Sequence, residues 1–103
     1  MKFDKNKAPI ALIPPEALTE IANVFAFGAE KYAVNDWRRD ANNTNWSRTY
    51  SSIQRHLMLF WQGEDIDPES GMSHVAHAAT QIMILLVQLQ EGKDADDRFS
   101  NEV

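Results

Sequence analysis

Apolar residues recur at helical spacing in three separate stretches of the chain. The stretches run from about Pro15 to Tyr32, from about Trp46 to Gln62, and from about His74 to Gln90. An apolar residue at every third or fourth position is typical of a helix that buries one face. No strand alternation of useful length accompanies them, so we predict an all-α fold of three main helices in a helical bundle.

The apolar stripes predict which helix faces are buried. The stripe is narrow in the first two helices, and its members are Leu18, Ile21, Ala22, Phe25 and Ala29 in the first and Trp46, Tyr50, Ile53, Leu57 and Phe60 in the second. The third helix is apolar nearly all round, which is typical of a helix buried on more than one side. Two other helices cannot easily surround it, so we predict that homo-oligomerisation completes the bundle.

Residues with known capping preferences mark the helix ends. Pro15 suits the first position of a helix, and Asn45 and Ser73 are good N-caps for the second and third helices. Gly63 and Gly92 are typical of the position just beyond a helix C-terminus. These signals agree with the helix limits that the apolar spacing predicts.

One domain is the natural interpretation of a 103-residue chain in which 44% of residues are hydrophobic. Within this single helical domain, 1–103, we predict an extended lead-in over residues 1–13 and a frayed polar tail over 93–103. Residues 33–45 form a long polar loop, and loops of this length in a compact domain are often functional.

The chain is acidic, with a formal net charge of −5. An acidic surface argues against binding to duplex nucleic acid or to anionic membranes. The chain has no cysteine, which excludes disulfides and thiolate metal sites. Its first residues lack the apolar core of a signal peptide, and no apolar run approaches 18 residues, so we expect a cytoplasmic protein without a membrane partner.

All three histidines of the chain lie between Arg55 and His77, on either side of an acidic turn. His74 and His77 are three residues apart and share one side of the predicted third helix. An antiparallel pair of helices would bring His56 toward them. Because neutral imidazole and carboxylate are ligands for Mg²⁺, Mn²⁺ and Zn²⁺, the segment predicts a metal-dependent site.

The acidic turn contains four carboxylates in six residues, namely Glu64, Asp65, Asp67 and Glu69. Each of them could share a metal with an imidazole or orient its ring. The alternative is a solvated, capped connection, because Asp67-Pro68 and Ser70-Gly71 are ordinary turn sequences. A single buried histidine is likewise more often just hydrogen-bonded, and it is the clustering of all three that favours function.

A second group of candidate residues is basic and aromatic. Its members are Lys31, Tyr32, Asn35, Trp37, Arg38, Arg39, Arg48 and Arg55. Lysine and arginine side chains bind phosphates, and Trp37 or Tyr32 could stack on a base. The alternatives are that Trp37 fills a gap in the core and that Lys31 only stabilises a helix C-terminus.

Three segments of the sequence carry a resemblance to a known family. KFDKNKAPIALIPPEAL, FGAEKYAVNDW and WSRTYSSIQRHLMLFWQGEDIDPESGMSHVAHAATQIMILL resemble the phage-associated dATP/dGTP diphosphohydrolase N-terminal domain family, a relative of MazG-like nucleotide pyrophosphohydrolases. The resemblance covers about residues 2–90. It implies a phage or prophage protein, in the cytoplasm of a bacterial host, that cleaves a purine dNTP to dNMP and pyrophosphate with a divalent metal.

The resemblance also gives the candidate residues their roles. The implied metal ligands are His56, Asp67, His74 and His77, with Mg²⁺ or Mn²⁺ favoured over Zn²⁺. The implied catalytic residues are Glu64, Asp67 and Glu69, which would hold the metal or act as general base. The implied substrate-binding residues are Lys7, Lys31, Tyr32, Asn35, Trp37 and Arg55, where the cations would neutralise the leaving pyrophosphate and an aromatic ring would stack on the purine.

The chain departs from the MazG pattern, which has ExxE on one helix and ExxD on another. Here His74-Val-Ala-His77 stands at the second position, and the first helix contains no ExxE. Two further hypotheses therefore stay open: an oligomer that sequesters a nucleotide or cyclic nucleotide without hydrolysing it, and a structural helical protein. Formation of product would distinguish an enzyme from a sequestering oligomer. A change of melting temperature on addition of nucleotide or metal would distinguish the sequestering oligomer from a structural protein.

Overall fold

The computed structural model describes residues 7–39 and 45–100 of the chain and is mostly helical. Its elements, in chain order, are the 3₁₀ turn η1 (Ile10–Leu12), α1 (Pro15–Lys31), the 3₁₀ turn η2 (Asp36–Arg38), α2 (Trp46–Trp61), β1 (Ile66–Asp67), β2 (Met72–Ser73) and α3 (His74–Gln90). The predicted all-α class and its three main helices are confirmed. No helix within the described ranges is long and apolar enough to cross a membrane.

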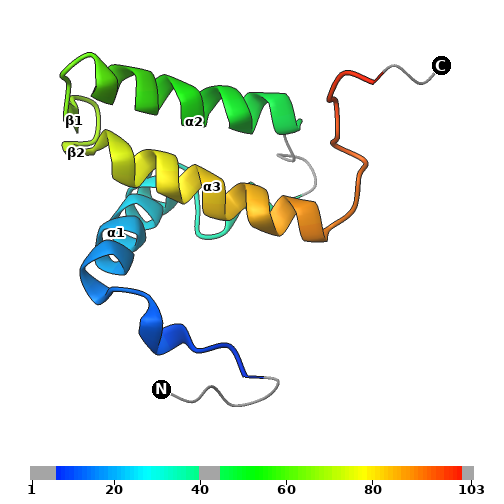
Figure 1. Cartoon of the computed structure of the whole chain (residues 1–103), viewed down its shortest axis with the longest axis horizontal. Coiled ribbons are helices and arrows are strands. Elements are labelled where there is room, and N and C mark those ends of the chain that lie inside the picture. Colours follow the sequence, from blue (N-terminus) through cyan, green and yellow to red (C-terminus); the bar gives the residue numbers. More distant parts are fainter. Residues whose placement is uncertain (1–6, 40–44, 101–103) are drawn as a thin grey trace.

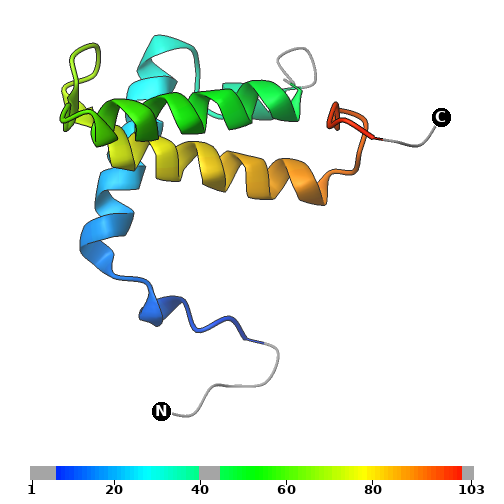
Figure 2. The same ribbon diagram turned by 45° about the horizontal axis from the view of Figure 1, so that its top comes forward.

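Helix α3 lies at the centre of the arrangement. It runs side by side with α2 in the opposite direction, and α1 crosses it steeply near its N-terminal end (Figures 1 and 2). A short antiparallel hairpin joins α2 to α3, with Ile66 paired to Ser73 and Asp67 paired to Met72. This connection places the end of α2 and the start of α3 beside each other.

The predicted helix limits agree closely with the structure. Helix α3 has the predicted bounds, while α1 and α2 each end one residue earlier, because Tyr32 and Gln62 are their C-cap residues. Gly63 and Gly92 follow α2 and α3 with φ of 103° and 110°, a left-handed backbone region that favours glycine.

Two local predictions were wrong. The acidic turn contains the β1–β2 hairpin, whose strands of two residues each are too short for a period-two pattern to be seen in the sequence. Within the lead-in, residues 10–12 form η1 and are not extended, with Ile13 donating its N–H to the Ile10 carbonyl at 2.9 Å. Residues 1–6 of that prediction lie outside the described range.

The buried faces of α1 and α2 differ from the predicted stripes. The buried residues of α2 are Trp46, Thr49, Ile53 and His56, whereas the predicted Tyr50 and Phe60 are 59% and 40% exposed. In α1 only Val24 is buried, and Leu18 and Ala22 are exposed. The cause is that the N-terminal half of α1 extends beyond the α2–α3 pair and has nothing to pack against within the described chain (Figure 1).

Ser73 is the N-cap of α3, as predicted. Its hydroxyl oxygen accepts the backbone N–H groups of Val75 at 3.1 Å and Ala76 at 3.3 Å, two donors that have no partner inside the helix. The cap therefore holds the turn that carries His74 and His77.

Replacing this cap is expected to cost measurable stability. In a Ser73→Ala variant we expect a loss of about 1 kcal/mol, which corresponds to a fall of roughly 4–8 °C in melting temperature for a domain of this size. The matched control is Ser51→Ala, because Ser51 is exposed on α2 and does not cap a helix. Thermal unfolding followed by circular dichroism measures both, and equal melting temperatures would refute the capping role.

The start of α2 is held by the C-terminal segment. Asn45 occupies the N-cap position without a side-chain cap bond, so its predicted capping role was wrong. Instead, Asp97 accepts the Ser47 N–H at 2.9 Å and also contacts the Ser47 hydroxyl, while the Ala95 carbonyl accepts the Trp46 N–H at 3.0 Å. We call residues 95–98 the C-terminal clasp. The prediction of a frayed tail was wrong for this part, because it contacts the start of α2.

Helix α3 keeps a large apolar surface in the single chain. Its exposed apolar residues are Val75, Ile82, Met83, Leu86 and Leu89. Helices α1 and α2 therefore leave part of the apolar surface of α3 uncovered in the single chain. Homo-oligomerisation stays a prediction.

Candidate functional site

A cleft of about 1410 Å³ opens between α1, the loop after it, α2 and the start of α3. Most of the predicted site residues line it, namely Lys31, Tyr32, Asn35, Trp37, Arg55, His56, Asp67, Glu69, His74 and His77. Two predicted residues, Lys7 and Glu64, do not line it. The structure therefore brings the histidine cluster and the basic, aromatic group to one place.

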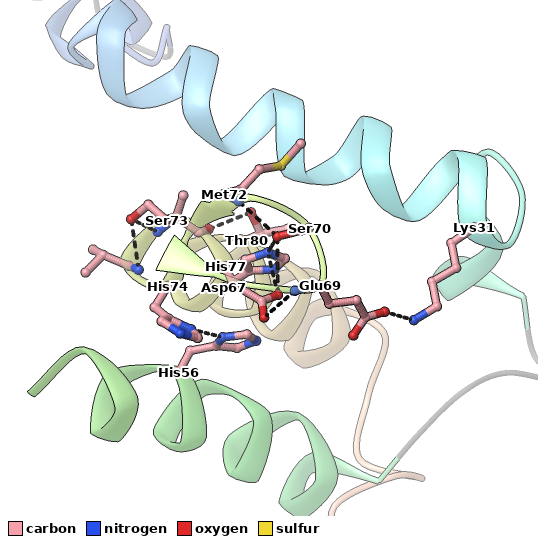
Figure 3. A network of polar contacts seen from close by, with 12 residues as sticks. Lys31, His56, Asp67, Glu69, Ser70, Met72, Ser73, His74, His77 and Thr80 are labelled. Carbon is pink, nitrogen blue, oxygen red and sulfur yellow. Dashed lines mark hydrogen bonds and ion pairs between the residues drawn. The ribbon is translucent and has the colours of Figure 1, made fainter. Parts of the chain in front are cut away.

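The three histidines form a compact cluster at the inner wall of the cleft (Figure 3). The Nδ1 atoms of His56 and His74 are 2.9 Å apart. The rings of His56 and His77 are stacked, with centroids 4.7 Å apart and an interplanar angle of 8°. All three residues are buried, and His74 is only 1% exposed. The predicted meeting of α2 and α3 histidines is thus present.

Each end of the cluster contacts a carboxylate of the connection between α2 and α3. His74 Nε2 lies 3.1 Å from Glu64 Oε2. His77 Nε2 lies 3.4 Å from Asp67 Oδ2 and 2.6 Å from the Ser70 hydroxyl. A carboxylate behind an imidazole fixes its ring orientation and tautomer, so both carboxylates can orient the cluster.

The contacts of His74 set the protonation pattern of His56. An ionised carboxylate only accepts, so the His74 Nε2 atom that faces Glu64 carries a proton. With its proton at Nε2, the His74 ring can accept at Nδ1, and its neighbour 2.9 Å away, His56 Nδ1, is then the donor. This leaves His56 Nε2 without a proton and makes Glu64 an orienting group behind the cluster, not a residue of the cleft.

Two of the imidazoles that line the cleft, those of His56 and His77, are held in their neutral form. Burial, together with repulsion from His77 when that ring is protonated and from the charged Arg55, lowers the pKa of His56 from 6.5 to about 4. Burial likewise lowers the pKa of His77. At neutral pH both rings are therefore uncharged proton acceptors.

Asp67 is held in its ionised form. Burial opposes ionisation, but hydrogen bonds from the Glu69 N–H at 3.3 Å and the Ser70 hydroxyl at 3.2 Å outweigh it, and the pKa of Asp67 is lowered. A carboxylate that is ionised at neutral pH thus lies beside His77 in the cleft wall.

The predicted metal ligands do not form a ready-made metal centre. Nowhere in residues 7–39 and 45–100 are three or more histidine, aspartate or glutamate side chains arranged to hold an ion. The reason is visible in the contacts, because both nitrogens of His74 and one each of His56 and His77 face partners within the cluster. A metal set of His56, Asp67, His74 and His77 stays a prediction, and no chemistry below depends on it.

Cations of α1 and α2 line the same cleft, and one of them, Arg55, directly precedes His56 on α2. Arg48, Ser52 and Arg55 follow one another at helical spacing along α2, and all three line the cleft. Within the part of the chain that the structure describes, neither arginine forms an ion pair shown by the geometry. Lys31, at the end of α1, is paired with Glu69 of the hairpin turn, and this pairing raises its pKa.

The aromatic candidates have different surroundings. Trp37 packs against Phe25, with centroids 6.2 Å apart, and the Arg38 guanidinium lies 4.7 Å from its ring. Tyr32 is 67% exposed, with the Lys31 ammonium 5.5 Å from its ring centroid. Trp37 therefore belongs both to the packing of α1 and to the wall of the cleft, and Tyr32 lies at its mouth.

Sequence reasoning did not select three residues that contribute to the site. Arg48 was recognised as basic but not assigned, although its spacing of seven from Arg55 places both on one face of α2. Ser52 lies between them on that face. Ser70 gives no signal of its own, because its partners are brought together by the hairpin.

Comparison with known proteins gives two matches and one negative result. The family model described as "dATP/dGTP diphosphohydrolase, N-terminal" matches residues 1–98. A relative named dATP/dGTP diphosphohydrolase, from Salmonella phage PMBT28, is 35% identical over 98 residues, which cover 95% of this chain. The same alignment covers 32% of the relative, so the chain spans about a third of that protein's length. No solved structure matches.

Proposed function

The chain belongs to the dATP/dGTP diphosphohydrolase N-terminal domain family, and from this premise we propose that its cleft binds a purine dNTP and hydrolyses it to dNMP and pyrophosphate. One observation carries the proposal. In a chain of net charge −5, two arginines that form no ion pair within the described residues line the same cleft as the buried, neutral imidazoles of His56 and His77. Triphosphate binding needs the first, and activation of a water molecule needs the second.

The arginines of α2 are the proposed phosphate-binding groups. Arg48 and Arg55 are seven residues apart, which corresponds to roughly 10 Å along a helix axis. Such a span suits the successive phosphates of a triphosphate, with the Ser52 hydroxyl between them. Guanidinium groups bind phosphate through paired charged hydrogen bonds, and these strengthen as charge develops on the leaving pyrophosphate.

His77 is the proposed general base. Its imidazole accepts a proton from water as the water oxygen attacks the α-phosphorus, and the bond from this phosphorus to the bridging oxygen breaks. The pyrophosphate leaves with the electron pair of that bond, and the arginines compensate its charge. A base with lowered pKa is neutral at working pH, and proton transfer of this kind contributes about 10²- to 10⁴-fold to rate.

Trp37 is the proposed contact for the purine, because its ring lines the cleft beside the cationic groups. Asp67 and Glu69, which line the cleft, are the carboxylates that would hold a divalent metal bound together with the triphosphate. Metal dependence is therefore a prediction about the substrate complex. It is tested by comparing the rate of hydrolysis in the presence of a chelator with the rate after addition of Mg²⁺, Mn²⁺ or Zn²⁺.

The test is product formation by the purified protein. We expect dNMP and pyrophosphate from dATP or dGTP, separated by ion-exchange chromatography. An Arg48→Ala, Arg55→Ala double variant should lose roughly 100-fold or more in kcat/KM, because each charged hydrogen bond contributes about 1.5–3 kcal/mol. Arg39→Ala is the matched control, since Arg39 pairs with Asp36 and does not line the cleft.

Intact dNTPs with every metal would refute the enzyme proposal for these substrates. The second candidate function is sequestration of a nucleotide without turnover. The feature that favours it is the missing ExxE motif in the first helix. A nucleotide that raises the melting temperature without forming product would support it.

A further inference from the structure

The Ser70 hydroxyl is the most contacted polar atom of the cluster. It belongs to the turn between β1 and β2 and accepts the Met72 N–H at 3.1 Å. It also donates to Asp67 Oδ2 at 3.2 Å and lies 2.6 Å from His77 Nε2 (Figure 3). Three partners surround an oxygen that has a single proton to give.

Counting protons decides how these contacts are made. The Asp67 carboxylate accepts two hydrogen bonds, from the Glu69 N–H at 3.3 Å and from the Ser70 hydroxyl at 3.2 Å, so the Ser70 proton points to Asp67. The Ser70 oxygen can then approach His77 Nε2 to 2.6 Å only if that nitrogen carries a proton and donates it. The second contact of the same nitrogen agrees, because Asp67 Oδ2, 3.4 Å away, also requires an N–H.

The opposite arrangement is unfavourable. If Ser70 donated to an unprotonated Nε2, the lone pair of His77 would face the Asp67 carboxylate at 3.4 Å. Asp67 would at the same time lose its bond from Ser70. A buried carboxylate left with fewer donors and an opposing lone pair is disfavoured on both counts.

We propose that Ser70 is a positioning residue that holds His77 as the Nε2–H tautomer and leaves Nδ1 as its basic nitrogen. The tautomer is a property of the protein alone. Its consequence for hydrolysis rests on the proposed function, in which Nδ1 of His77 would receive the proton from water. A site that needs a lone pair at one fixed position depends on the tautomer as much as on the pKa.

Nitrogen-15 NMR of the histidine rings tests the proposal. The chain has three histidines, so the spectrum of ¹⁵N-histidine-labelled protein contains three ring patterns. At a pH above the usual histidine pKa, we expect His77 to show a protonated Nε2 and an unprotonated Nδ1. In Ser70→Ala only the longer contact with Asp67, at 3.4 Å, remains at Nε2, so that pattern should shift toward a mixture of both tautomers. In Ser70→Thr, which keeps the hydroxyl, it should be retained.

Controls separate this role from general structural damage. Glu64→Ala removes the carboxylate behind His74 and should leave the His77 pattern unchanged. Ser70→Ala is accepted only if its circular dichroism shows folded helices; Ser70→Thr supplies the result if it does not. A wild-type His77 with protonated Nδ1, or an unchanged pattern in folded Ser70→Ala, would overturn the proposal.

Kinetics give the second measurement. We expect Ser70→Ala to lower kcat by roughly 10-fold with little change in KM, since the bound phosphates do not contact Ser70 in the proposed mode. A rise in KM without a fall in kcat would contradict a positioning role. If the protein hydrolyses no dNTP, the NMR result still decides the tautomer, so the two failures remain distinguishable.

Discussion

Acidification through the interval from pH 6.5 to about 4 is expected to reduce the stability of the fold by roughly 2–3 kcal/mol. The unfolded chain binds a proton at His56 near pH 6.5, whereas the folded chain does so only near pH 4. Between these values the unfolded state holds more protons than the folded state. The contribution of His56 to the free energy of unfolding is therefore fully present above pH 6.5 and is lost as the pH falls toward 4. His77 acts in the same direction, since burial lowers its pKa as well.

Chemical denaturation at a series of pH values, in the presence of a chelator, measures this effect. His56→Asn is the informative variant, because the asparagine amide can still donate toward His74 Nδ1 but does not titrate. We expect the variant to lose most of the slope of stability against pH in this interval. An unchanged slope would mean that acid sensitivity comes from other groups.

Charge placed on the exposed apolar face of α3 is expected to abolish self-association. Helix α3 contains no charged residue, and its outward face carries Ile82 and Leu86, which are 44% and 55% exposed. Two copies of a chain with net charge −5 repel each other except where uncharged faces meet. We therefore expect the native chain to associate through this face and an Ile82→Glu, Leu86→Glu variant to be monomeric.

Sedimentation velocity over a range of protein concentrations tests the expectation. The control variant is Ser51→Glu, Gln62→Glu, which adds the same two charges at exposed positions in α2 and at its C-cap. It should associate like the native chain if the α3 face is the contact. A native chain that is monomeric at every concentration, or a control that dissociates equally, would refute the interface.

The helices could be predicted from sequence because their signals are local. Apolar spacing sets the bounds of α3, and Ser73 and Gly92 mark its ends within a few residues. The buried face of α2 could not be predicted in the same way. It depends on polar pairs with α3, such as Thr49 with Gln88 at 3.3 Å, so hydrophobicity alone selected Tyr50 and Phe60 instead.

The candidate site was predictable to the extent that its residues are close in sequence. His56, His74 and His77 lie on helices joined by a short connection, so their meeting followed from an antiparallel pair. The roles of Glu64 and Ser70 did not follow, because the hairpin decides which side chain faces which ring. The C-terminal clasp was missed for a related reason, since Ser47 and Asp97 are 50 residues apart.

This difference in sequence separation bears on the order in which the molecule assembles. The contacts of the histidine cluster join residues 7, 10 and 18 positions apart, whereas the Lys31–Glu69 pair and the clasp join residues 38 and 50 apart. Closing a short loop loses less chain entropy, and local contacts form faster. The α2–hairpin–α3 unit is therefore expected to act as the folding nucleus, onto which α1 and the clasp dock later.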